Sequence, residues 1–237
     1  MSTPVLQVEG LRFAWPGSRE DCLDIAAFTV AAGDTVFVHG PSGCGKSSLL
    51  ALAAGVLLPQ HGRVLLAGRD WQGLGRAARD RWRVDHVGIV FQQFNLLPYL
   101  SVLDNVLLPC RFSKQRQRAA AQQGGSARAQ AGHWLAAMGL DEALWSRQPG
   151  QLSVGQQQRV AAARALVGMP ALVIADEPTS ALDEDRRDAF VDLLLAACAG
   201  AGSALLFVSH DRRLAPRFGR QVALPELNRA AAGRAVA

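Results

Sequence analysis

Two short stretches of the sequence combine residues that bind phosphate with residues that activate water. The first, GPSGCGKS at 40–47, has the spacing GxxxxGK[ST]. Glycines in this pattern let backbone N–H groups face a phosphate, Lys46 adds a positive charge for the β- and γ-phosphates, and the Ser47 hydroxyl is a ligand for Mg²⁺. The expected nucleotide contacts are Gly40, Pro41, Ser42, Gly43, Cys44, Gly45, Lys46, Ser47 and Ser48. The pattern predicts a site for ATP.

The second stretch is a pair of carboxylates after an apolar run. LVIADE at 172–177 places Asp176 and Glu177 directly behind four apolar residues. Open α/β folds bind ligands at the carboxyl ends of their strands, so we expect Asp176 to hold Mg²⁺ and Glu177 to act as the general base for the attacking water. A helix cap is the competing interpretation. It is disfavoured because Pro178 follows at once and the next helix is expected only near Asp183.

Short apolar runs alternate with longer helix-like stretches, which is typical of an α/β fold with a mixed, mostly parallel sheet. The run TVFVH at 35–39 precedes the glycine-rich loop and a helix-like run follows it, as phosphate binding requires. The expected strands are Val5–Val8, Ile25–Val30, Thr35–His39, Arg63–Leu66, Val87–Val90, Ala171–Ala175 and Ala204–Ser209.

The middle of the chain has a different composition. Ala, Leu, Gln and Arg dominate between Gln92 and Val167, and these are good helix formers. We therefore expect an inserted helical subdomain at about 92–167, with a loop at Gln122–Ser126, within one domain spanning 1–237. The core would comprise 1–91 and 168–225, and 226–237 would be a flexible tail.

Composition excludes several classes of protein. The chain has 237 residues, no apolar run of the roughly 18 to 20 residues that a spanning helix needs, and no visible secretory signal. Its four cysteines form no CxxC pair, which argues against a zinc site and fits reduced thiols in the cytoplasm. The net charge of +5 is partly carried by the basic segment Arg111–Gln130. With only 6% aromatic residues, that segment indicates a solvated surface, and we expect no nucleic-acid partner.

A further motif separates this chain from other phosphate-loop proteins. LSVGQQQRVAAARAL at 152–166 resembles the LSGGQ signature and following helix of the ATP-binding cassette (ABC) ATPases. In that family the signature contacts ATP held by a partner subunit. The resemblance implies that Ser153, Gly155 and Gln156 act in trans, in a homodimer that closes around two ATP molecules. An ordinary amphipathic helix explains the alanines but not LSxGQ at the helix entrance.

Val154 departs from the family pattern, because a glycine is usual at this position. If the backbone there requires a positive φ, a β-branched residue costs about 1 to 2 kcal/mol. If the backbone is extended or helical, the substitution changes little.

The other family positions are also filled. The resemblance implies that Gln92 contacts Mg²⁺ and the attacking water, that Ser180–Asp183 is the D-loop that crosses to the partner subunit, and that His210 is the switch histidine near the γ-phosphate. The aromatic residue expected to stack on adenine is Trp15, with Phe13 as the alternative.

Within the family, the run FNLLPYLSVLDNVLLP at 94–109 is most similar to the MacB, LolD and FtsE group. This implies the ATPase subunit of an ABC transporter that drives a separate membrane permease, for example one of FtsX or MacB type, in export, lipoprotein release or mechanotransmission. Amino-acid importers also carry FNL, so the ATPase of such an importer is the alternative. The subunit would lie on the inner face of the cell membrane.

The permease is expected to dock in a groove beside Gln92. The apolar residues predicted to line it are Phe94, Leu96, Leu97 and Tyr99, although each is about as easily explained as a core residue. Other phosphate-loop ATPases fit less well. Chromosome-structure ATPases need a long coiled coil before the signature, ABC translation factors carry two cassettes, and an inactive binding module would lack Lys46 or Glu177.

Overall fold

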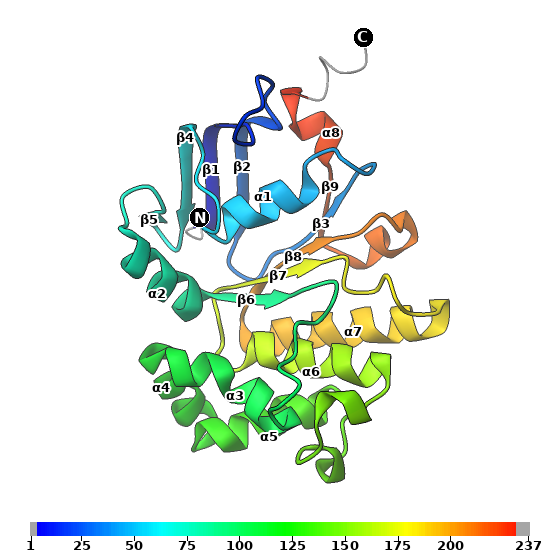
Figure 1. Cartoon of the computed structure of the whole chain (residues 1–237). Helices are drawn as coiled ribbons and strands as arrows, with labels where there is room; N and C mark the ends of the chain where they lie inside the picture. The colour runs from blue at the N-terminus through cyan, green and yellow to red at the C-terminus, as the bar shows by residue number, and fades with distance from the viewer. Residues whose placement is uncertain (1–3, 231–237) are drawn as a thin grey trace.

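Two sheets form the centre of the protein, and the computed structural model describes residues 4–230 of it (Figure 1). One sheet is antiparallel, with the order β2-β1-β4-β5. The other is parallel throughout, with the order β6-β7-β8-β3-β9. The strands are β1 (Pro4–Phe13), β2 (Leu23–Ala31), β3 (Thr35–His39), β4 (His61–Leu66), β5 (Arg69–Asp70), β6 (Val87–Val90), β7 (Leu172–Asp176), β8 (Ala204–Val208) and β9 (Arg220–Ala223).

The burial of the strands explains this division. Every residue of β8 is buried, as expected for a parallel strand covered on both faces, whereas β1 has several exposed positions. The expected α/β fold is confirmed, with the parallel and antiparallel strands separated into two sheets.

Helices cover both faces of the parallel sheet (Figure 1). Helix α1 lies between the two sheets, α6 and α7 lie on the other face of the parallel sheet, and α3 to α5 lie beyond them. The helices are α1 (Lys46–Ala53), α2 (Arg76–His86), α3 (Val102–Phe112), α4 (Lys114–Gly124), α5 (Ala127–Ala137), α6 (Val154–Leu166), α7 (Glu184–Ala201) and α8 (Leu224–Leu227). Within residues 4–230, no helix has the length and apolar character needed to cross a membrane.

Two hydrophobic clusters lie on the two faces of the parallel sheet. On β3, Val36 and Val38 belong to the cluster under the antiparallel sheet, and Phe37 belongs to the cluster under the helices. This alternation follows from the two-residue period of a strand. Both clusters therefore hold β3 in place, and β3 leads directly into the phosphate loop.

Several helices and strands differ from those expected from the sequence. Strands β3 and β6 have the expected bounds, but β5, β9 and α2 were missed, because β5 is only two residues long and neither β9 nor α2 buries a residue fully. The expected loop at 122–126 is shorter, since α4 continues through its glutamines to Gly124. The expected tail at 226–237 begins inside α8, and 231–237 lies outside the described residues.

A single methyl group should weaken the packing of β6 on α6. A Cβ at Gly88 would lie 2.2 Å from the Ala165 carbonyl oxygen, so Gly88→Ala must shift backbone. We expect a loss of roughly 1 to 3 kcal/mol, measured as a lower urea midpoint. Gly150→Ala is the control, because a Cβ there meets open space. Equal midpoints for the two variants would contradict the close β6–α6 contact.

Candidate nucleotide site

The phosphate loop connects β3 to α1. Gly43 and Gly45 have φ values of 78° and 102°, in the left-handed region that favours glycine. A Cβ at Gly45 would also lie 2.7 Å from a methyl group of Leu23. Helix α1 begins at Lys46, so its free N–H groups and positive dipole end point at the loop. The loop therefore has the backbone geometry that an anion site needs.

Lys46 and its serine neighbours have different environments. The Lys46 ammonium donates hydrogen bonds to the carbonyl oxygens of Gly40, at 2.8 Å, and Pro41, at 3.0 Å, which holds its charge over the loop. The Ser47 side chain lies near Asp176 and lowers the pKa of that carboxyl. The Ser48 hydroxyl is buried and lies 3.5 Å from the Cys22 sulfur. The Lys46 ammonium is thus positioned to contact a phosphate, and the Ser47 hydroxyl is positioned to contact a metal ion.

The strand order brings distant residues to the same edge. Strand β8 lies between β3 and β7, so the ends of all three strands meet. The Glu177 N–H donates to the Val208 carbonyl oxygen at 3.0 Å, and the Ser209 N–H donates to that of Val38 at 3.2 Å. The phosphate loop, both carboxylates and His210 therefore gather at the carboxyl edge of the parallel sheet.

Asp176 is in an environment that opposes its charge. Burial and the adjacent Glu177 carboxylate raise the pKa of Asp176, while the nearby Ser47 hydroxyl and the Lys46 charge lower it less. No group of three or more His, Cys, Asp or Glu residues within 4–230 could hold a metal ion. One carboxylate and one hydroxyl suit Mg²⁺ that takes its other ligands from substrate phosphates and water. Ser47 and Asp176 are therefore suitable ligands for Mg²⁺ when a nucleotide is bound.

Glu177 has a strained backbone. Its φ of 47° is unusual for a residue other than glycine, and such strain is concentrated at functional sites. Its carboxylate accepts a hydrogen bond from Nδ1 of His210 at 2.7 Å. The Glu177 side chain is mostly buried, whereas the His210 side chain is mostly exposed. The His210 imidazole therefore fixes the orientation of the Glu177 carboxylate at the carboxyl edge of the parallel sheet.

Gln92 and Trp15 are both exposed. Gln92 follows β6 at the same edge of the sheet, and among residues 4–230 no hydrogen bond joins it to either carboxylate. Trp15 is 50% exposed, whereas Phe13 is 3% exposed and contacts Trp15 edge to face. Of these two rings, Trp15 is the one that is exposed to solvent.

The signature residues start α6. Ser153 is the N-cap, its hydroxyl accepts the Gln156 N–H, and the Gln156 side chain accepts the Ser153 N–H. Val154 is the first helical residue and its φ is not positive, so it imposes no left-handed strain. A Cβ at Gly155 would lie 3.8 Å from Leu182, and these two residues line one pocket with Ser153 and Gln156. The signature and D-loop thus form one surface.

The expected docking residues are divided between core and surface. Phe94 is buried, Leu96 packs on the core and Leu97 is half-buried, whereas Tyr99 is exposed. Phe94 therefore belongs to the core, and it was wrong to place it on a docking surface.

Another groove was missed because sequence does not reveal exposure. It has a volume of about 260 Å³ and is bordered by the exposed rings of Phe91 and Phe112. Three arginines and no acid line this groove: Arg83, Arg116 and Arg164. Burial lowers the pKa of Arg116 to about 10, and its Nε has no partner among residues 4–230.

Asn228 also lies at the site, with no sequence motif to mark it. It is 2% exposed. Its side-chain amide donates to the carbonyl oxygens of Cys22 at 3.0 Å and Cys44 at 3.4 Å, and its oxygen accepts the Asp24 N–H at 2.8 Å. The residue after α8 therefore joins the phosphate loop to the start of β2.

Comparison with known proteins gives consistent matches. The family model described as "ABC transporter" matches residues 23–180. "Lipoprotein-releasing system ATP-binding protein LolD" of Paramagnetospirillum magneticum is 39% identical over 95% of this chain and 97% of its own. LolD of Novosphingobium aromaticivorans is 41% identical over 95% of this chain and 98% of its own. The structure "Dimeric structure of a post-hydrolysis state of the ATP-binding cassette MJ0796 bound to ADP and Pi" has a TM-score of 0.79 at 31% identity, over 95% of each chain.

Neutralising Asp176 should stabilise the nucleotide-free protein. Because the pKa is raised on folding, the charged form costs stability above the folded pKa, and this cost vanishes below the ordinary pKa of an aspartate. Asp176→Asn should therefore raise the melting temperature at pH 7, and the gain should shrink as the pH falls through that window.

Asp185→Asn, at an exposed position on α7, controls for the loss of one negative charge. A gain that is equal in both variants, or that persists at low pH, would contradict the unfavourable environment of Asp176.

Proposed function

Because the chain belongs to the ABC transporter family, it is an ATP-binding and ATP-hydrolysing subunit of a transporter, and we propose that hydrolysis takes place at the edge of its parallel sheet. The subunit works as a homodimer with a membrane permease on another chain. The single observation that supports the proposed location is the register of β3, β8 and β7, which places the strand that leads into the phosphate loop in line with Asp176 and Glu177.

We assign the residues as follows. Backbone N–H groups of 40–48 and the Lys46 ammonium bind the β- and γ-phosphates, and Trp15 stacks on adenine. Ser47, Gln92 and Asp176 hold Mg²⁺, which when bound neutralises charge on the phosphate oxygens.

Glu177 takes a proton from the attacking water as the water oxygen bonds to the γ-phosphorus. The bond from that phosphorus to the β-bridging oxygen breaks, which leaves ADP and phosphate. His210 holds the Glu177 carboxylate in position through the hydrogen bond at Nδ1. Glu177 is thus the general base, and His210 orients it near the γ-phosphate.

The second half of each site comes from the partner subunit in our proposal. Ser153 is exposed and Gln156 is half-buried at the positive end of α6, which suits a γ-phosphate held by another copy. Gly155 leaves room beside Leu182, so the D-loop and the signature can approach the partner as one surface. Two ATP molecules would then be enclosed between two subunits.

The substrate class follows from the relatives. The names of the LolD relatives favour lipoprotein release over amino-acid import, so we propose that this subunit powers a lipoprotein-releasing permease of FtsX or MacB type from the inner face of the membrane. We also retain the division into a core, 1–91 and 168–225, and a helical subdomain at 92–167.

The permease is proposed to dock in the groove between Phe91 and Phe112. Exposed rings of this size are typical of interface anchors. Of the three arginines that line the groove, Arg83 pairs with Asp80, whereas Arg116 and Arg164 donate only to backbone carbonyl oxygens among residues 4–230. A permease segment that combines an apolar face with a carboxylate would complement these charges.

Replacing the general base should trap the dimer. Glu177→Gln keeps the shape of the side chain but cannot accept the proton, so hydrolysis should be at least about 100-fold slower while ATP binding persists. Gel filtration with ATP and Mg²⁺ should then show a stable dimer, and Glu142→Gln, at an exposed position, should behave as wild type. Hydrolysis by E177Q at the wild-type rate would refute the assignment of the base.

Removing one aromatic ring should weaken permease binding. Phe112→Ala deletes a ring that is 75% exposed, so the fold should persist while affinity for the co-expressed permease falls about tenfold, as for an interface anchor. Val56→Ala is the control, because Val56 is exposed outside the groove. Co-purification is measured beside a melting curve, and undiminished recovery of the permease with F112A would place the docking surface elsewhere.

A further inference from the structure

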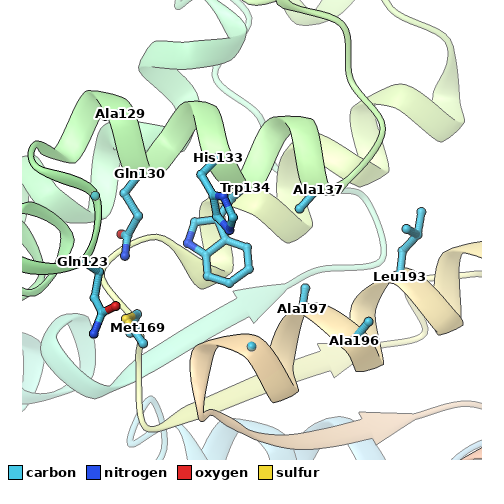
Figure 2. A pocket seen from close by; sticks show the side chains of 12 residues that line it. Gln123, Ala129, Gln130, His133, Trp134, Ala137, Met169, Leu193, Ala196 and Ala197 are labelled. Carbon is cyan, nitrogen blue, oxygen red and sulfur yellow. The ribbon is translucent and has the colours of Figure 1, made fainter.

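A second cavity lies away from the nucleotide site and the docking groove. It has a volume of about 550 Å³ and is formed by the end of α4, by α5, by Met169 and by α7 (Figure 2). This size is within the range of small-molecule sites, about 300 to 1,000 Å³. It shares no lining residue with the docking groove.

Small residues create this cavity. Ala137 on α5 faces Ala196 and Ala197 on α7, and these methyl groups do not fill the space between the helices (Figure 2). Trp134 reaches across to α7, since a Cβ at Gly200 would lie 3.9 Å from its ring. The pocket opens to the surface, since Ala137 and Ala196 are exposed, and it reaches inward to the buried Trp134 and Ala197.

Trp134 also has an unmet hydrogen-bonding group. The residue is 5% exposed, and its indole Nε1 is buried without a partner among residues 4–230. Three other tryptophans donate this hydrogen to a carbonyl oxygen: Trp71 to Ala53, Trp82 to Leu66 and Trp145 to Leu140. Trp134 is the exception, although a buried indole N–H usually has an acceptor.

The polar groups of the cavity set the chemistry of its ligand. No Asp, Glu, Lys or Arg lines it, so no permanently charged side chain faces a ligand there. Gln123 and the exposed imidazole of His133 are further polar groups of its wall. Gln130 is buried, and its side-chain oxygen accepts the Gly168 N–H at 2.7 Å, which leaves its NH₂ group as a donor. Figure 2 shows the Trp134 nitrogen on the ring edge turned toward Gln130 and Met169. The rest of the wall is mostly apolar, including Leu193.

We propose that this cavity is a binding site for a neutral, mainly apolar small molecule that carries a hydrogen-bond acceptor such as a carbonyl oxygen. The acceptor takes the Trp134 indole N–H, with the Gln130 amide as a second donor. The apolar body lies against Met169 and Leu193. The bound molecule bridges α5 and α7.

The test uses coumarin, a neutral bicyclic molecule with a carbonyl acceptor, and naphthalene, which has a similar shape and no acceptor. In the ¹⁵N-labelled full chain, coumarin should shift the Trp134 indole resonance saturably, and this resonance is identified by its loss in Trp134→Phe. In methyl-labelled protein the Met169 methyl should report the same titration. Trp134→Phe should bind coumarin roughly two- to tenfold more weakly, the range of one net hydrogen bond, and should bind naphthalene unchanged.

Filling the cavity provides the matched control. Ala196→Leu introduces a large side chain at the exposed rim of the cavity, and Ala199→Leu does so at an exposed position of α7 that does not line it. A196L should abolish the Met169 response to coumarin, and A199L should retain it. The proposal is overturned if coumarin moves neither resonance, if A196L binds like wild type, if A199L also loses binding, or if W134F binds coumarin as tightly as wild type.

Discussion

The hydrogen bonds on the two sides of β8 determine where every charged group of the nucleotide site lies. Val208 is opposite Val38 on one side and opposite Asp176 on the other. One register therefore aligns the end of β3, which carries the phosphate loop, with the end of β7, which carries the carboxylates. A slip of one residue would reverse the faces of β8 and separate these groups. The strand is buried along its whole length, which makes such a slip costly.

Two residues at the carboxyl edge of the parallel sheet lower the stability of the fold. Asp176 is buried next to another carboxylate, and Glu177 has a backbone conformation that few side chains adopt. Both features are unfavourable to the isolated fold, and both place negative charge where Mg²⁺ and a water molecule would need it. The adjacent hydrophobic clusters on both faces of the sheet supply the burial that tolerates these local costs.

The sequence predicted the features that depend on a short, continuous stretch of residues. The glycine-rich loop follows a strand and precedes a helix as expected, and the apolar run before Asp176 is a buried strand. Val154 needed the structure, because only its place as the first residue of α6 shows that a glycine is not required. The solvent exposure of a side chain and its contacts with distant parts of the chain could not be predicted from a short stretch of sequence. Phe94 and Phe112 are the same residue type, yet one is buried and the other is 75% exposed, because tertiary packing decides which ring meets solvent.

The position of β3 also has a consequence for the order in which the chain folds during synthesis. β3 is translated early, but both of its neighbours, β8 and β9, come from residues 204 to 223, and Asn228 secures the Cys44 carbonyl later still. While the ribosome is still adding the middle of the chain, the phosphate loop has no paired strand to support it. A nascent chain would therefore acquire nucleotide-binding competence late, once the strands that flank β3 have been translated.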